Sequence, residues 1–378
     1  MAFVMKQILS EAKIVRLPSK KVRIAHIDSE LNGLWSQFNK NISQGETVMR
    51  ACMSNLIIYC DTPGEAEIIN QELTVIVDAH PARVLLLTGK GEPEAGALEA
   101  FVSIYYTNVP DGLQVCAERI DVVSSADASG RLPSVARAQL IGDLPTALWW
   151  ASRQPPPEAG RVFFELAELA EHIIYDNMGW VNPAKGVAGM TRWVAAQQDE
   201  FIVYNLAWRR TANWRKLISQ VLDPLVAPNA LASLRLIKID HGPHALAMTW
   251  LLVGWLGFQL EWQATEGKFL SASEIIWKFR NGHHEIRIIA HRLSEGEPLL
   301  YRVLFDWGDA EHEGLICFER LDGERIGIVE TRPPSPSRVF ASITPKRSAM
   351  VSAQLAHRNR DKVFENALVV SNAMVELF

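Results

Sequence analysis

The chain has no long hydrophobic run, which limits where it can reside. Its longest apolar stretch, from Ala245 to Phe258, is shorter than the roughly 20 residues that a helix needs to cross a bilayer. We therefore expect a buried helix there and no membrane partner. The segment from Met1 to Arg16 mixes charged and apolar residues and has no signal-peptide core, so the sequence predicts a cytoplasmic protein.

Cysteine is also scarce, with 4 residues in 378, and none occurs in a CxxC pair or at zinc-ligand spacing. We expect reduced, buried thiols at Cys52, Cys60, Cys116 and Cys317. A redox pair of Cys52 and Cys60 remains an alternative if a turn brings the two together.

An excess of positive charge is missing as well. The formal net charge is −5 and the pI is near 6.1, whereas nucleic-acid-binding proteins usually carry a basic surplus. We expect no nucleic-acid partner. Hydrophobic residues at 48% and charged residues at 21% are typical of a soluble globular protein, and the length suggests two domains.

Recognisable catalytic and ligand motifs are absent too. The segment from Thr88 to Glu94 lacks the Gly-Lys-Ser/Thr of a phosphate loop, and Glu94 replaces the third glycine of a dinucleotide fingerprint. No HExxH or Gly-x-Ser-x-Gly motif occurs. His241 and His244 flank a helix start, and the neighbouring His283 and His284 would face opposite sides of a strand. We predict no catalytic residue, no metal and no cofactor.

The first half of the chain alternates strand and helix patterns, which predicts an α/β N-terminal domain. Pro110-Asp111-Gly112 signals a hairpin between strands at 101–108 and 113–122, so the sheet should be mixed. The other predicted strands are 55–60, 84–87 and 146–150, and the predicted helices are 28–38, 63–79, 133–141 and 162–172.

The second half predicts an α+β C-terminal domain. Helices are expected at 211–222 and 243–260 around a strand at 234–239, followed by an antiparallel sheet from 274 to 331 and helices to Leu377. We expect an N-terminal helical segment over 1–50, an α/β domain over 51–190, and an α+β domain with C-terminal helices over 191–378.

Two tryptophan-rich segments stand out. Adjacent residues of a strand face opposite sides, so Trp149 and Trp150 should project to different faces, either into the core or to a partner. Trp208-Arg209-Arg210 combines indole and guanidinium groups, which suits a protein hot spot, an interdomain latch or a sugar-phosphate site. Arg83 precedes a buried strand, and we expect its charge to reach a carboxylate or the sheet edge and its role to be structural.

Several of these segments resemble the glucose-6-phosphate dehydrogenase assembly protein family, OpcA. They occur in family order: Glu30–Trp35, His80–Leu87, Asp143–Trp150, Leu206–Arg215 and Leu251–Leu256. One departure is Ala82, where many members of the family carry cysteine, so redox behaviour tied to that position would be absent here.

The resemblance implies a non-catalytic assembly factor and allosteric activator of glucose-6-phosphate dehydrogenase in the oxidative pentose phosphate pathway. Residues that cluster within the segments resembling the family are our candidates for binding the partner. They are Asp143, Pro145, Trp149, Trp150, Trp208, Arg209, Arg210 and Trp214. Two alternatives stay open on the residues alone: a sugar-phosphate-binding α/β enzyme with an unrecognised active site, and a purely structural subunit.

Overall fold

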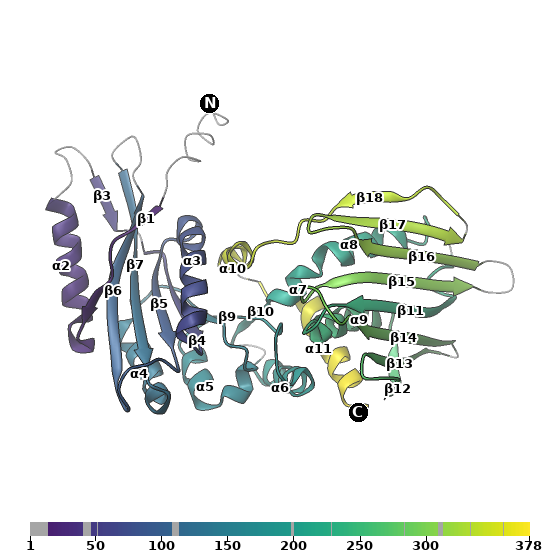
Figure 1. Ribbon diagram of the computed structural model, residues 1–378, viewed down its shortest axis with the longest axis horizontal. Coiled ribbons are helices and arrows are strands. Elements are labelled where there is room, and N and C mark those ends of the chain that lie inside the picture. The colour runs from purple at the N-terminus through teal and green to yellow at the C-terminus, as the bar shows by residue number, and fades with distance from the viewer. Residues whose placement is uncertain are drawn as a thin grey trace.

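The computed structural model contains two β-sheets that lie side by side, each with its own helices (Figure 1). The structure describes residues 14–40, 47–50, 52–107, 113–197, 200–227, 229–282, 284–308, 313–332, 334–357 and 359–378.

The first sheet has ten strands and is mixed, as predicted. Its path is β1-β6-β7-β5-β4-β8-β9-β10, with β2 on β6 and β3 on β7. The strands from β7 through β10 along this path are parallel, whereas β6 pairs antiparallel with β7. The bounds are β1 Ile14–Arg16, β2 Lys20–Val22, β3 Thr47–Arg50, β4 Ser54–Cys60, β5 Ala82–Thr88, β6 Leu98–Thr107, β7 Leu113–Ser124, β8 Thr146–Trp150, β9 His172–Tyr175 and β10 Ile202–Asn205.

The β6–β7 pairing confirms the predicted hairpin, although Pro110-Asp111-Gly112 lies outside the described residues. The first helices also match expectation: α2 Ile27–Lys40, α3 Pro63–Ala79 and α4 Leu132–Gln139. Thr62 and Glu65 form a capping box at the start of α3, which satisfies two backbone donors there.

The predicted helix over 162–172 is too long. The helix α5 covers Arg161–Ala167, and His172 begins the strand β9. The segment from His172 to Tyr175 is buried throughout, and a short apolar run of this kind does not distinguish a strand from a helix end by periodicity. Helices α6 Pro183–Ala196 and α7 Leu206–Arg210 follow, on either side of β10.

The second sheet has eight strands in the order β12-β13-β14-β11-β15-β16-β17-β18. Their bounds are β11 Leu234–His241, β12 Gln263–Phe269, β13 Glu274–Asn281, β14 His284–Arg292, β15 Leu300–Gly308, β16 Glu313–Arg320, β17 Arg325–Arg332 and β18 Arg338–Ala341. The prediction of an antiparallel sheet needs one correction, because β11 pairs parallel with β14. The chain leaves β11 through helix α9 Leu246–Gln259 before entering β12, and a helical crossover lets strands run in the same direction.

Two long helices, α9 and α11 Lys362–Val375, pack together beside the second sheet (Figure 1). Their axes approach closely at Gly254, where an added Cβ would lie 2.2 Å from the Ala367 carbonyl oxygen. The helix α9 is buried along nearly its whole length. Among the described residues, no helix combines the length and apolar character that a bilayer span requires.

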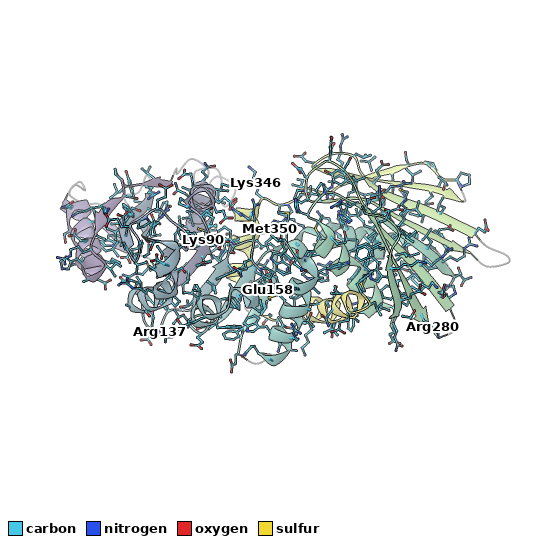
Figure 2. The ribbon with its side chains drawn as sticks, turned by 60° about the horizontal axis from the view of Figure 1, so that its bottom comes forward. Lys90, Arg137, Glu158, Arg280, Lys346 and Met350 are labelled. Carbon is cyan, nitrogen blue, oxygen red and sulfur yellow. The ribbon has the colours of Figure 1, made fainter. Side chains whose placement is uncertain are left out.

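Helix α10 Arg347–Ala356 joins the two halves. It follows the second sheet in the chain but packs on α3 of the first, with Met350 and Val351 in the same apolar cluster as the α3 residues. Arg347 forms an ion pair with Glu72 of α3 at 2.9 Å. Figure 2 shows Met350 at the junction between the two sheets. The last helices therefore fasten both sheets to one another.

A buried ion pair and its hydrogen bonds link four segments of the first half: α2, β5, β7 and α4. The Arg83 Nε donates to Glu118 Oε2 at 2.7 Å, and its NH1 donates to the Gln139 carbonyl oxygen at 2.9 Å. The Trp35 indole of α2 donates to the other oxygen of Glu118 at 2.8 Å. The predicted carboxylate partner and structural role of Arg83 are confirmed.

We predict that Glu118→Gln destabilises the protein by about 3 kcal/mol, because it leaves the buried Arg83 charge with only the longer, exposed contact to Asp28 at 3.5 Å. Chemical denaturation followed by circular dichroism measures the loss. The matched control is Glu99→Gln, which breaks an exposed pair with Lys21 and should change stability by no more than about 0.5 kcal/mol. Equal effects of the two substitutions would contradict this assignment.

Candidate functional site at the Trp208–Arg209 corner

The tryptophan pair of β8 lies inside the protein. Trp149 and Trp150 are each 1% exposed, and they belong to the apolar clusters on opposite faces of the first sheet, as strand alternation predicts. Trp150 stacks on Tyr59 with ring centroids 4.3 Å apart, and its indole donates to the Gln154 carbonyl oxygen. The guanidinium of Arg347 lies 5.3 Å from the Trp149 ring centroid. Neither indole offers surface to a partner in this structure.

Trp208 is positioned by the end of strand β10. Asn205 caps α7 by accepting a hydrogen bond from the Trp208 backbone N–H at 2.7 Å, a favoured role for asparagine at a helix start. The Trp208 indole donates to Asp361 Oδ2 at 2.7 Å, and Asp361 itself caps α11. Trp208 thus ties β10 to the last helix and is 2% exposed.

Arg215 lies against the Trp208 ring, with its guanidinium carbon 3.4 Å from the ring centroid. It belongs to helix α8 Ala212–Val221 and donates to the Thr211 hydroxyl and the Trp208 carbonyl oxygen. Burial lowers the pKa of Arg215, and the nearby Asp361 carboxylate opposes that shift. Cation–π stacking contributes most where water is excluded, so this contact helps to hold α7 and α8 together.

Arg210 and Trp214 also have structural partners. Arg210 forms two contacts with the Asp176 carboxylate, at 2.8 and 2.9 Å, and its side chain is 6% exposed. Trp214 is 1% exposed and lies beside Arg320 of β16. The Arg210–Asp176 pair joins the two halves of the chain, as the latch interpretation expects, whereas Trp208 and Trp214 contact Asp361 and Arg320 within the second half.

Three candidates reach the surface, in two places. Asp143 is exposed with a φ of 62°, and Pro145 is half-buried while its carbonyl oxygen accepts from the Asn55 N–H. Both precede β8, whereas Arg209 follows β10. The two strands run parallel within one sheet. Asp143 and Pro145 therefore lie at the amino ends of the strands, and Arg209 lies at the carboxyl ends. The half-buried Arg209 has no hydrogen bond or ion pair within the part of the chain that the structure describes.

Sequence patterns gave no indication of Asp176 or Asp361 as partners of the Trp208-Arg209-Arg210 segment. Asp361 lies 153 residues from Trp208, so local spacing cannot connect the two. The available signal was Asp361 itself, an acidic residue immediately before an apolar helical pattern, which is typical of a helix cap.

The other groups with possible chemistry are engaged locally. The Nδ1 of the buried His241 bonds to the Gly242 carbonyl oxygen, and burial lowers the pKa of His241. His284 bonds to the Leu234 carbonyl oxygen, whereas His283 lies outside the described residues. Across the described ranges, no cluster of three or more His, Cys, Asp or Glu side chains could hold a metal.

In the segment from Thr88 to Glu94, the backbone amides of Gly89 and Gly91 donate to the Cys60 and Ser124 carbonyl oxygens. These amides are therefore not available to cradle a phosphate.

The chain belongs to the glucose-6-phosphate dehydrogenase assembly family, OpcA. Two family models match in succession and together cover more than half of the chain. Residues 74–192 match the model described as the glucose-6-phosphate dehydrogenase subunit N-terminal domain, and residues 202–368 match the corresponding C-terminal domain.

Curated relatives agree with this assignment. An OxPP cycle protein OpcA of Nostoc punctiforme is 26% identical over 79% of this chain and 66% of its own length. A protein of the same name from Synechocystis is 28% identical over 59% of this chain and 44% of its own length. The matches thus span less than two thirds of the relatives' length.

Solved structures show only a distant likeness. A dehydrogenase (MviM) from Clostridium difficile is 10% identical with a TM-score of 0.45, covering 85% of this chain and 97% of that chain. A levoglucosan dehydrogenase in complex with NADH is 11% identical with a TM-score of 0.48, covering 86% and 96%. Likeness at this level carries no information about activity or cofactor.

We predict that Asp361→Ala lowers the free energy of unfolding by about 2–4 kcal/mol, because it removes a helix cap and leaves the Trp208 indole without its acceptor. Asn182→Ala is the matched control. Asn182 caps α6, a helix of the same 14-residue length as α11, through the Lys185 N–H alone, and its loss should cost about 1 kcal/mol. Urea denaturation measures both losses of unfolding free energy. Equal losses for the two variants would show that the Trp208–Asp361 hydrogen bond does not stabilise the protein.

We also predict that Cys60 resists alkylation in the folded protein. Burial raises the pKa of its thiol to about 12, so only about one molecule in ten thousand carries the reactive thiolate at pH 8. Iodoacetamide labelling followed by peptide mass spectrometry should modify Cys60 only in denaturant, whereas the half-exposed Cys52 and Cys317 should react before it. Rapid labelling of Cys60 in the native state would contradict this and revive a redox role.

Proposed function

We propose that the protein is a non-catalytic assembly factor and allosteric activator of glucose-6-phosphate dehydrogenase, acting by direct protein–protein binding. The observation that carries this proposal is the succession of the two family models, whose descriptions both name the dehydrogenase subunit, along residues 74–192 and 202–368. The OpcA relatives, which are named for the oxidative pentose phosphate cycle, support the same pathway.

Activation needs no chemistry from the activator. A partner that binds the active oligomer more tightly than the inactive form shifts the population by that difference in affinity. A coupling free energy of about 1–3 kcal/mol changes affinity by roughly 5–150-fold. The buried ion pair of Arg83 and the α10 connection between the sheets supply the rigid scaffold that such an interface requires.

Within this proposal, docking falls to the surface members of the candidate set. Trp149, Trp150, Trp208 and Trp214 are each at most 2% exposed, so their contribution would be to hold the scaffold. Arg209, Asp143 and Pro145 remain as contacts, and the oppositely charged Arg209 and Asp143 lie at opposite ends of the parallel strands. Arginine is enriched among interface hot spots, and the half-buried Arg209 would lose little conformational freedom on binding.

We predict that adding the purified chain to glucose-6-phosphate dehydrogenase of the same organism changes the dehydrogenase rate at a given substrate concentration and the sedimentation of its oligomer. The chain alone should turn over neither glucose 6-phosphate nor NADP. A sugar-phosphate-binding enzyme would show turnover by itself, and a structural subunit would bind without changing the rate curve. Either result would overturn the proposed activation.

Arg209→Ala should weaken the complex by about tenfold, the loss of one charged interfacial contact. Arg192→Ala on the exposed side of α6 is the control and should leave binding unchanged. Biolayer interferometry against immobilised dehydrogenase measures both. If Arg209→Ala folds, binds and activates like the unmodified chain, Arg209 is not a docking residue.

A further inference from the structure

A cavity of about 340 Å³ lies at the Trp208–Arg209 corner. Its walls come from the end of β10, from α7, from the end of α10, and from the connection into α11. We propose that this cavity is an anion site that binds the phosphate group of a small metabolite. The inference does not depend on the dehydrogenase partner, because it concerns a ligand of the chain itself.

The acidic group in the cavity wall, Asp361, has both carboxylate oxygens occupied by hydrogen bonds from the chain. Asp361 Oδ1 accepts from the Phe364 N–H at 2.9 Å, and Oδ2 accepts from the Trp208 indole at 2.7 Å. Arg360 is likewise committed, with two hydrogen bonds to the Glu365 carboxylate at 2.6 and 2.8 Å. Asp361 keeps its negative charge, and set against Arg209 and Lys362 it leaves one net positive charge among the described wall groups that have no oppositely charged partner.

Two cations in the wall are uncommitted in the part of the chain that the structure describes. Arg209 and Lys362 line the cavity, and neither forms a hydrogen bond or ion pair there. Lys362 is the first residue of α11, a helix of 14 residues, so the positive end of a helix dipole adds to its charge. The exposed His357 contributes a further ring at the rim.

A buried amide gives the independent indication of a missing ligand. The Nε2 of Gln354 has no hydrogen-bond partner although the residue is 1% exposed, and it lines the same cavity. Leaving a buried donor unsatisfied costs about 1–3 kcal/mol, and native proteins rarely do so. Asn205 Nδ2 lies in the same wall and also lacks an acceptor in good geometry, but the Tyr175 hydroxyl beside it offsets part of that cost.

The donor set fits a phosphate group better than a carboxylate. A phosphate monoester offers three acceptor oxygens and nearly two negative charges, which matches a guanidinium, an ammonium and an amide from three separate segments. Arginine binds phosphate through its planar fork and lysine as a point charge. The cavity volume falls in the range of small-molecule sites, so a small organic group can accompany the phosphate.

Isothermal titration calorimetry on the full chain tests this site with three probes: inorganic phosphate, glucose 6-phosphate as a representative monoester, and glucose. We expect saturable binding of both phosphate species and none of glucose. Tighter binding of glucose 6-phosphate would identify the ligand as a phosphorylated metabolite, and equal binding would identify free phosphate. If neither phosphate species binds saturably, the proposal is overturned.

Two variants locate the binding at this cavity. Lys362→Gln removes an exposed charge without disturbing the core, and Gln354→Met removes the buried amide while keeping its volume. Each should raise the Kd for the phosphate species by about tenfold or more. Lys185→Gln is the matched control, because Lys185 is an exposed lysine in the first turn of α6, and it should bind as the unmodified chain does. Binding that survives both cavity substitutions places the phosphate elsewhere and contradicts the inference.

Discussion

The structure depends on covering both faces of the central parallel strands of the first sheet. Strand β8 is buried along its whole length, with Trp149 on one face and Trp150 on the other. Helices α4 and α5 cover one face, but the other needs α3 together with α10, which comes from the far end of the chain. Because α10 is needed to cover this face, the C-terminal region of the chain returns to pack on the first half.

That return explains the corner around Trp208. Helix α10 packs on α3 and α11 packs on α9, and the connection between them passes β10, where the Tyr204 hydroxyl donates to the His357 carbonyl oxygen at 2.7 Å. Asp361 in this connection bonds to Trp208, and the same passage leaves the cavity that holds Arg209, Lys362 and the buried Gln354 amide. The Trp208–Asp361 contact and the proposed anion site are thus consequences of the same chain path.

Much of the fold follows from periodicity in the sequence. Two-residue alternation placed Trp149 and Trp150 on opposite faces, and proline and glycine positions predicted α3 and the β6–β7 hairpin. The parallel β11–β14 pair and the partners of Trp208 could not be predicted, because they join segments far apart in the chain. The burial of individual side chains could not be predicted either. The composition of the Trp208-Arg209-Arg210 segment suits a hot spot and a latch equally. Only the packing shows that Arg210 is paired with Asp176 while Arg209 is not paired among the described residues.

The central claim is that this protein acts through its surface on another folded subunit. Hydrogen–deuterium exchange of the chain, with and without glucose-6-phosphate dehydrogenase, tests it most directly. The account predicts slower exchange on binding at a discrete surface that includes α7, while β8 stays equally protected in both states. Identical exchange across the whole chain, at dehydrogenase concentrations that would saturate the chain, would contradict it.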